Sequence, residues 1–205
     1  FIPPDVFIGL MEKTGFIVKL GQFVLEEVLK QQKRWELFKF KQIHVSINVS
    51  MIEIATGEFV EHVERQLIHH QVNPELIKFE ITEGTAMISE IQTEKYFYKL
   101  KKLGVGISLD DFGTGYTSFT YLKKFPADIL KIDKSLVDHI LLNKEDQRIV
   151  KAMIELGHSL GMKIVVEGIE TKKMVTLLAS YSCDYMQGYY FDKPLPVFEF
   201  QKLLR

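Results

Sequence analysis

Cysteine, excess charge and long apolar runs are all scarce in this sequence. Cys183 is the single cysteine among 205 residues, which excludes an internal disulfide and fits a reducing compartment. The formal net charge of −1 provides no overall basic field of the kind that holds proteins on nucleic acids or anionic membranes. No apolar run approaches the ~20 residues of a membrane-spanning helix. We therefore expect no contact with a membrane or a nucleic acid polymer.

The first residues also lack the features of a targeting segment. FIPPDVF has neither the basic region nor the long apolar region of a signal peptide, and the chain does not begin with Met. We therefore expect a piece of a longer cytoplasmic protein, or of the cytoplasmic part of a membrane-anchored one. The residues present are 46% hydrophobic and 26% charged, which is enough apolar material for one sizeable core. A single domain over 1–205 is the expected organisation.

Strand-like runs alternate with helix-like stretches along the whole chain. The six strand candidates are 43–49, 76–82, 105–110, 128–133, 163–168 and 183–188. The helix candidates are 15–33, 56–70, 86–103, 117–124, 144–160, 170–180 and 196–204. Strands separated by helices require crossover connections, so the pattern predicts a parallel sheet of the α/β class.

Each strand candidate also has one polar face. In 76–82, for example, Glu80 alternates with Phe79 and Ile81. When helices cover both sides of a parallel sheet, its strands are normally apolar at almost every position. A TIM-like (β/α)8 barrel explains the difference, because its inner strand faces meet in a mouth at the C-terminal rim. About two of its eight strands are then missing. An open doubly wound sheet is the alternative, and it leaves the repeated polar face unexplained.

The polar residues that these strands carry toward their C-terminal ends form the candidate site. They are Asn48, Glu80, Asp110, Asp111, Lys131, Asp133, Glu167 and Gln187. So many carboxylates in one mouth repel one another unless cations hold them together. Carboxylate and amide oxygens are hard ligands, which suit Mg²⁺ or Mn²⁺. The sequence therefore predicts a site for divalent metal ions at the barrel rim.

The stretch SLDDFGTGYTS, residues 108–118, places two adjacent aspartates before a loop with two glycines. Neighbours on a strand point to opposite sides, so Asp110 and Asp111 reach one metal site only where the chain bends, and the glycines permit a bend. Two divalent ions roughly 3.5–4 Å apart clamp the attacking and leaving oxygens of a phosphoryl displacement. Metal-assisted hydrolysis of a phosphoester is the predicted chemistry. Sugar isomerases and aldolases, which also gather acids and lysine at a barrel mouth, are the alternatives.

Six ordered motifs resemble one family. They are INVS (47–50), FEITE (79–83), LDDFGTGYTS (109–118), LKID (130–133), VVEGIE (165–170) and MQGYYFDKPLP (186–196). In order and spacing they are similar to the EAL domain family, the bacterial phosphodiesterases that linearise the second messenger cyclic di-GMP to pGpG. The resemblance covers essentially the whole chain.

The resemblance implies a role for each site residue. Asn48, Glu80 and Asp110 would bind one of two Mg²⁺ or Mn²⁺ ions, and Asp110 would bridge to a second ion that Asp111 also holds. Lys131 and Glu167 would position or activate the attacking water, and either could act as the base. Asp133 and Gln187 would line the substrate pocket. Glu83 and Glu170 would brace the FGTGY loop, which couples the site to a homodimer interface in similar proteins.

The chain departs from the family at its beginning. The Glu-Ala-Leu motif, a substrate-binding arginine and the first two strands would all precede Phe1. Without the Glu of that motif, the chain as given would lack one metal ligand and could be inactive. A cyclic di-GMP receptor that binds without cutting, or a barrel enzyme for another substrate, therefore stays open. Attached sensory or cyclase domains are expected in the longer protein.

Several of these residues also have simpler interpretations. Taken alone, Asp110 and Asp111 fit a solvated turn, and Lys131 fits a surface lysine. Glu83 and Glu170 suit the first turn of a helix. His69 and His70 resemble a metal pair, but helix neighbours diverge by about 100°, whereas ligand pairs prefer a spacing of four. The aromatic run 189–191 fits either core packing or stacking on a guanine base.

Overall fold

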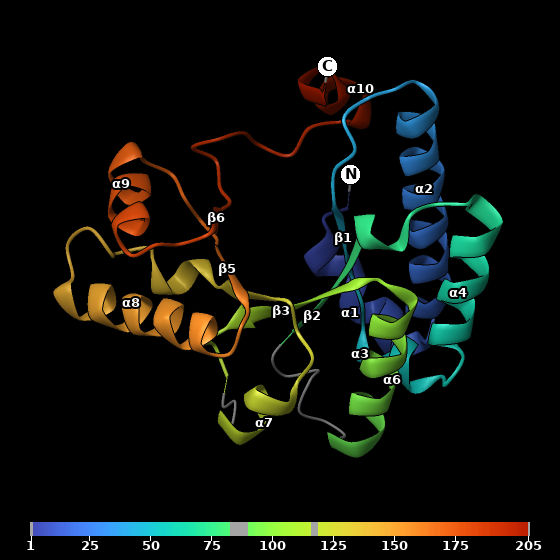
Figure 1. Cartoon of the computed structure of the whole chain (residues 1–205), viewed down its shortest axis with the longest axis horizontal. Helices are drawn as coiled ribbons and strands as arrows, with labels where there is room; N and C mark the ends of the chain where they lie inside the picture. The colour runs from blue at the N-terminus through green and yellow to red at the C-terminus, as the bar shows by residue number, and fades with distance from the viewer. Residues whose placement is uncertain (1, 83–89, 116–118, 205) are drawn as a thin grey trace. The chain divides into compact units, whose positions relative to one another are not determined.

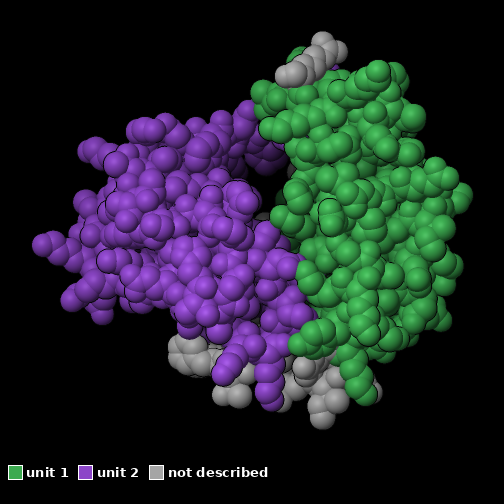
Figure 2. All heavy atoms as spheres, in the orientation of Figure 1, with its two compact units in different colours: residues 1–81, 91–106, 201–205 green, residues 82–90, 107–200 purple. Residues whose placement is uncertain are grey.

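The computed structural model describes residues 2–82, 90–115 and 119–204 (Figure 1). These residues divide into two compact units, residues 1–81, 91–106 and 201–205 and residues 82–90 and 107–200, coloured green and purple in Figure 2. In the described part of the chain, no helix is both long and apolar enough to cross a membrane.

The first unit is mainly helical. Its helices are α1 (Pro4–Thr14), α2 (Ile17–Leu37), α3 (Met51–Ala55), α4 (Phe59–His70), η1 (Pro74–Leu76), α6 (Glu90–Leu103) and η3 (Gln201–Leu204). Its strands β1 (Val45–Asn48) and β2 (Ile77–Thr82) pair in parallel. The long helix predicted over 15–33 extends to Leu37, and α1 precedes it as a separate helix. Pro4 begins α1 and Gly15, at φ +74°, ends it, because glycine adopts the left-handed conformation without steric cost.

The second unit continues the alternation of strand and helix. Its elements are β3 (Gly106–Phe112), α7 (Phe119–Lys124), β4 (Ile129–Ile132), η2 (Lys134–Leu136), α8 (Lys144–Ser159), β5 (Lys163–Val166), α9 (Lys172–Ser180), β6 (Tyr185–Met186) and α10 (Val197–Phe200). β3, β4, β5 and β6 pair in parallel in sequence order. All six predicted strands are present among the described residues, each within a few residues of its expected bounds.

The strand faces in the second unit are divided as the sequence predicts. Leu130, Ile132, Ile164 and Val166 are fully buried, and they form the apolar core on one face. Lys131 lies between Leu130 and Ile132, on the opposite face of β4, and yet it is only 5% exposed. Burial of a lysine is rare unless an acid pairs with it. At Lys131, the polar face of these strands is therefore buried in the protein and is not exposed to solvent.

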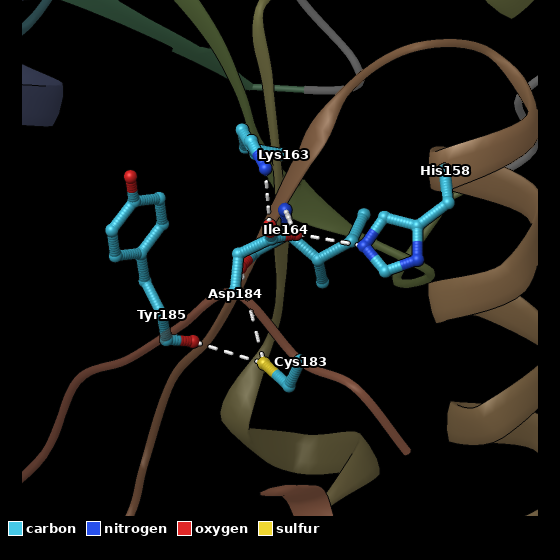
Figure 3. A network of polar contacts seen from close by, with 6 residues as sticks. All are labelled: His158, Lys163, Ile164, Cys183, Asp184 and Tyr185. Atoms are coloured by element: carbon cyan, nitrogen blue, oxygen red, sulfur yellow. Dashed lines mark hydrogen bonds and ion pairs between the residues drawn. The ribbon is translucent and has the colours of Figure 1, made fainter.

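Asp184 holds the N-terminal end of β5 in place (Figure 3). Its carboxylate accepts hydrogen bonds from Lys163 Nζ at 2.7 Å and from the Ile164 N–H at 2.9 Å, and it contacts His158 Nε2 at 2.7 Å. Burial alone would raise the pKa of Asp184. The hydrogen bonds from Lys163, Ile164 and His158 outweigh burial and lower the pKa to about 2. The folded state therefore favours the ionised carboxylate.

The Asp184→Asn variant is expected to lower the free energy of unfolding at pH 7 by about 1–2 kcal/mol. Because the folded pKa lies below the unfolded value, the contribution of Asp184 is complete above about pH 4 and is lost as the pH falls toward 2. Urea unfolding of both proteins between pH 2 and 7 measures this. The stability difference should shrink on acidification, and a constant difference would contradict the account. Asp138→Asn, at an exposed aspartate of the same unit, is the matched control.

Candidate functional site

β3 changes register at the two adjacent aspartates. Its pairing with β4 runs through Leu109 and shifts before Phe112, and Asp111 has a left-handed φ of +54°. An extra residue in one strand bends that strand and redirects the side chains around it. The sequence predicted a bend permitted by the glycines that follow. The bend instead begins at Asp111 itself, because a short polar side chain tolerates this conformation.

Lys131 joins two carboxylates of the second unit. Its Nζ lies 2.9 Å from Asp110 Oδ1 and 2.7 Å from Glu167 Oε1. Asp110 Oδ1 also accepts the Asp111 N–H at 3.0 Å. The side chains of Lys131, Asp110 and Glu167 are only 6%, 12% and 19% exposed, so little water screens their charges. We call these residues, together with Asp111, the carboxylate–lysine cluster.

The carboxylate–lysine cluster fits a divalent metal ion. Asp110, Asp111 and Glu167 each offer a carboxylate oxygen, and the three oxygens lie within 4.8 Å of one another. Three oxygen donors at this spacing suit a hard cation such as Mg²⁺ or Mn²⁺. One ammonium group among three carboxylates leaves a net negative charge, which favours a bound cation. The structure thus brings together four of the residues predicted from the sequence.

Asp133 and Gln187 follow the ends of β4 and β6. The Asp133 carboxylate accepts the Ser135 N–H at 2.9 Å and caps η2. Burial alone would raise the pKa of Asp133, but hydrogen bonds from Ser135 and the Lys134 N–H outweigh burial and lower it. Gln187 is exposed. Its backbone N–H donates a hydrogen bond to the Val166 carbonyl, and its carbonyl accepts one from the Ile169 N–H. The predicted role of these two residues in substrate binding stays a prediction.

Asn48 and Glu80 belong to the first unit. They are direct partners in the parallel register of β1 and β2, and the Val49 N–H donates to the Glu80 carbonyl at 2.9 Å. Adjacent strands thus carry both residues at the same level, as the sequence predicts for C-terminal strand ends. Their assignment to a metal stays a prediction.

The predicted bracing of the FGTGY loop concerns residues that are only partly described. Glu83 and residues 116–118 lie outside the described part of the chain. Glu170 is exposed and directly precedes Thr171, whose side chain caps α9. Within the described part of the loop, Thr114 Oγ1 donates to the Asp111 carbonyl at 2.8 Å. This bond fixes the turn that follows Asp111.

Gly168 is a site residue that the sequence reasoning did not single out. It follows Glu167 with a φ of +71°, and a Cβ atom at this position would overlap the side chain of Lys134. A larger residue would therefore displace the chain that carries Glu167. The sequence did contain an indication of this role, because Gly168 directly follows Glu167 at the end of a predicted strand.

The sequence matches the EAL domain family over residues 1–194. The signaling protein YkoW of Bacillus subtilis is 36% identical over 202 residues, which cover 98% of this chain and 25% of the relative. The bifunctional diguanylate cyclase/cyclic di-GMP phosphodiesterase MucR of Pseudomonas aeruginosa is 37% identical over 195 residues, which cover 95% of this chain and 28% of the relative. The chain thus spans about a quarter of the length of these curated relatives.

Solved structures show the same fold. The structure of the PaMucR phosphodiesterase in complex with c-di-GMP superposes with a TM-score of 0.91 at 37% identity and covers 97% of this chain and 87% of that chain. The EAL enzyme Bd1971, bound to cAMP and cyclic-di-GMP, gives a TM-score of 0.93 at 29% identity over 100% of this chain and 56% of that chain. These similarities confirm the α/β class and the TIM-like barrel predicted from the sequence, with six parallel strands among the described residues.

Proposed function

Because this chain belongs to the EAL domain family, we propose that it is a metal-dependent phosphodiesterase domain that hydrolyses cyclic di-GMP to linear pGpG. The observation that carries the proposal is the carboxylate–lysine cluster, in which three acids and one lysine gather at the ends of neighbouring strands. The c-di-GMP complex of the similar PaMucR phosphodiesterase supports the choice of substrate.

The residues of this chain have distinct tasks in the proposed reaction. As predicted from the sequence, Asp110 and Asp111 would hold Mg²⁺ or Mn²⁺ together with Asn48 and Glu80. The position of Glu167 adds its carboxylate as a further oxygen donor for an ion at Asp110 and Asp111. Two such ions supply the charge stabilisation at the attacking and leaving oxygens of an in-line displacement. Asp133 and Gln187 would contact the substrate.

Lys131 and Glu167 would handle the attacking water. Their contact of 2.7 Å places an ammonium donor beside a carboxylate acceptor, so the Lys131 ammonium would orient the water and the Glu167 carboxylate would take its proton. The water oxygen bonds to phosphorus, the bond from phosphorus to one ribose oxygen breaks, and that oxygen takes up a proton. The product is a linear dinucleotide. A cytoplasmic location, a homodimer formed through elements after the 109–118 loop, and attached sensory or cyclase domains belong to the same proposal.

An assay of the purified protein with cyclic di-GMP tests the proposal. We expect chromatography to show pGpG with Mg²⁺ or Mn²⁺ and none after chelation. Ca²⁺ should suppress turnover, because its looser coordination disfavours tight in-line geometry. Cyclic di-GMP that binds with either ion but stays intact would instead identify a receptor. A protein that neither binds nor cuts cyclic di-GMP would overturn the substrate assignment and favour a barrel enzyme for another substrate.

A further inference from the structure

The segment that follows Glu167 is bonded to the turn that follows β6. The Ile169 N–H donates to the Gln187 carbonyl at 3.0 Å, and the Ile169 carbonyl accepts the Tyr190 N–H at 2.9 Å. Both backbone groups of Ile169 are thus paired with residues 187–190, which we call the β6 turn. Ile169 is fully buried, so its backbone groups need these partners.

Gly188 allows the β6 turn to approach this closely. A Cβ atom at Gly188 would overlap the backbone nitrogen and the carbonyl oxygen of Ile169. These backbone atoms are already hydrogen-bonded, so they cannot turn aside as the end of a flexible side chain can. A side chain at this position would therefore force the β6 turn and the segment around Ile169 apart. The two hydrogen bonds of Ile169 depend on the glycine.

The same segment is confined on its other side by the chain that follows β4. A Cβ atom at Gly168 would overlap the side chain of Lys134, the first residue of η2, and would lie 3.2 Å from its Cα atom. β4 and β6 are the two neighbours of β5 in the sheet. Residues 167–169 therefore lie between the segments that follow both neighbouring strands, and a glycine permits the close packing at each contact.

This packing determines where the Glu167 carboxylate lies. Glu167 directly follows β5, and its Oε1 lies 2.7 Å from Lys131 Nζ. Only Gly168 separates Glu167 from Ile169, so a shift of Ile169 is passed along the backbone to Glu167. We propose that Gly188 is a positioning residue, which holds the Glu167 carboxylate in place through the backbone of Ile169. The inference rests on the proposed function, in which this carboxylate would take a proton from the attacking water.

Gly188→Ala tests the proposal, and Gly161→Ala is the matched control. Gly161 has a left-handed φ of +78°, and no described atom beyond the adjoining residues lies within 4 Å of the position of a Cβ atom there. Alanine at Gly161 therefore strains the backbone of the same unit without pressing on residues 167–169.

The carboxyl signal of Glu167 reports its position without metal or substrate. In protein with ¹³C-labelled glutamate, the signal is assigned by its loss in Glu167→Gln. We expect it to shift in Gly188→Ala and to keep its position in Gly161→Ala. An unchanged signal in Gly188→Ala, or an equal shift in both variants, would overturn the proposal.

Turnover supplies a second readout. A displacement of about 1 Å at a reacting group costs roughly 100-fold in rate. We therefore expect Gly188→Ala to lower the single-turnover rate of cyclic di-GMP hydrolysis with Mn²⁺ by about 100-fold, and Gly161→Ala to stay within about twofold of the parent. A parental rate for Gly188→Ala would contradict the proposal. A parent protein that does not cut cyclic di-GMP would refute the proposed function, and the Glu167 signal would then still show whether Gly188 positions this carboxylate.

Amide hydrogen exchange in the parent protein needs no variant. If the β6 turn holds Ile169, the Ile169 and Tyr190 amides should both exchange at least about 100-fold more slowly than amides of an unstructured peptide. Exchange of either amide at the unstructured rate would overturn the proposal, even if Gly188→Ala fails to fold.

Discussion

Replacing Asp110 with asparagine is expected to reduce the turnover of cyclic di-GMP about 1000-fold. In the proposed mechanism Asp110 would help to hold the metal ions, and such ions would contribute several kcal/mol of transition-state stabilisation. A loss of about 4 kcal/mol corresponds to a factor of about 10³ in rate. The asparagine side chain still offers an oxygen to Lys131 Nζ and to the Asp111 N–H, so the fold should be retained. Single-turnover product formation at saturating Mn²⁺ measures the effect.

Asp138→Asn is the matched control for this variant. Asp138 is an exposed aspartate of the same unit, so the change in net charge is identical and turnover should stay within twofold of the parent. Full turnover by Asp110→Asn would refute the metal assignment. Equal loss in both variants would show that the effect comes from net charge and not from the carboxylate–lysine cluster.

Replacing Lys131 with methionine is expected to lower the free energy of unfolding by about 3–5 kcal/mol in the absence of divalent ions. Lys131 Nζ contacts both Asp110 and Glu167, and all three side chains are largely buried. Removal of the ammonium group leaves the two carboxylates to repel one another with little solvent around them. Mg²⁺ or Mn²⁺ should restore part of the loss, because a bound cation replaces the missing positive charge. Urea unfolding with and without Mn²⁺ measures both effects.

Lys123→Met provides the comparison, since Lys123 is an exposed lysine of α7. Its replacement should change the stability by less than about 0.5 kcal/mol. A loss below about 1 kcal/mol for Lys131→Met would show that water screens the cluster as it screens a surface ion pair. Turnover by Lys131→Met at the parental rate would exclude Lys131 from the handling of the attacking water.

The strands could be predicted from the sequence because their two faces differ in polarity. Leu130 and Ile132 alternate with Lys131, and this period of two identifies both the strand and its inner face. Helix α1 was missed, because the predicted helix began only at residue 15. The segment before it opens with Pro3 and Pro4, and a proline pair is typical of loops as well as of helix starts, so it did not identify a helix.

The sequence predicted which residues form the candidate site, but it did not predict the backbone conformation that brings them together. The order of the motifs indicated Asp110, Asp111, Lys131 and Glu167, which the structure brings together. The bulge at Asp111 was not predicted in place, because both aspartates and glycines can adopt a positive φ. The role of Gly188 was not anticipated at all. It depends on the contact with Ile169 in a separate loop, and such tertiary proximity is absent from a local sequence pattern.

Anomalous diffraction from crystals of the protein grown with Mn²⁺ tests the central claim most directly. The account predicts a strong anomalous peak within about 2.5 Å of carboxylate oxygens of both Asp110 and Asp111, and none there in crystals of Asp110→Asn. A fully occupied Mn²⁺ site elsewhere on the chain, with no peak at these two aspartates, would contradict it.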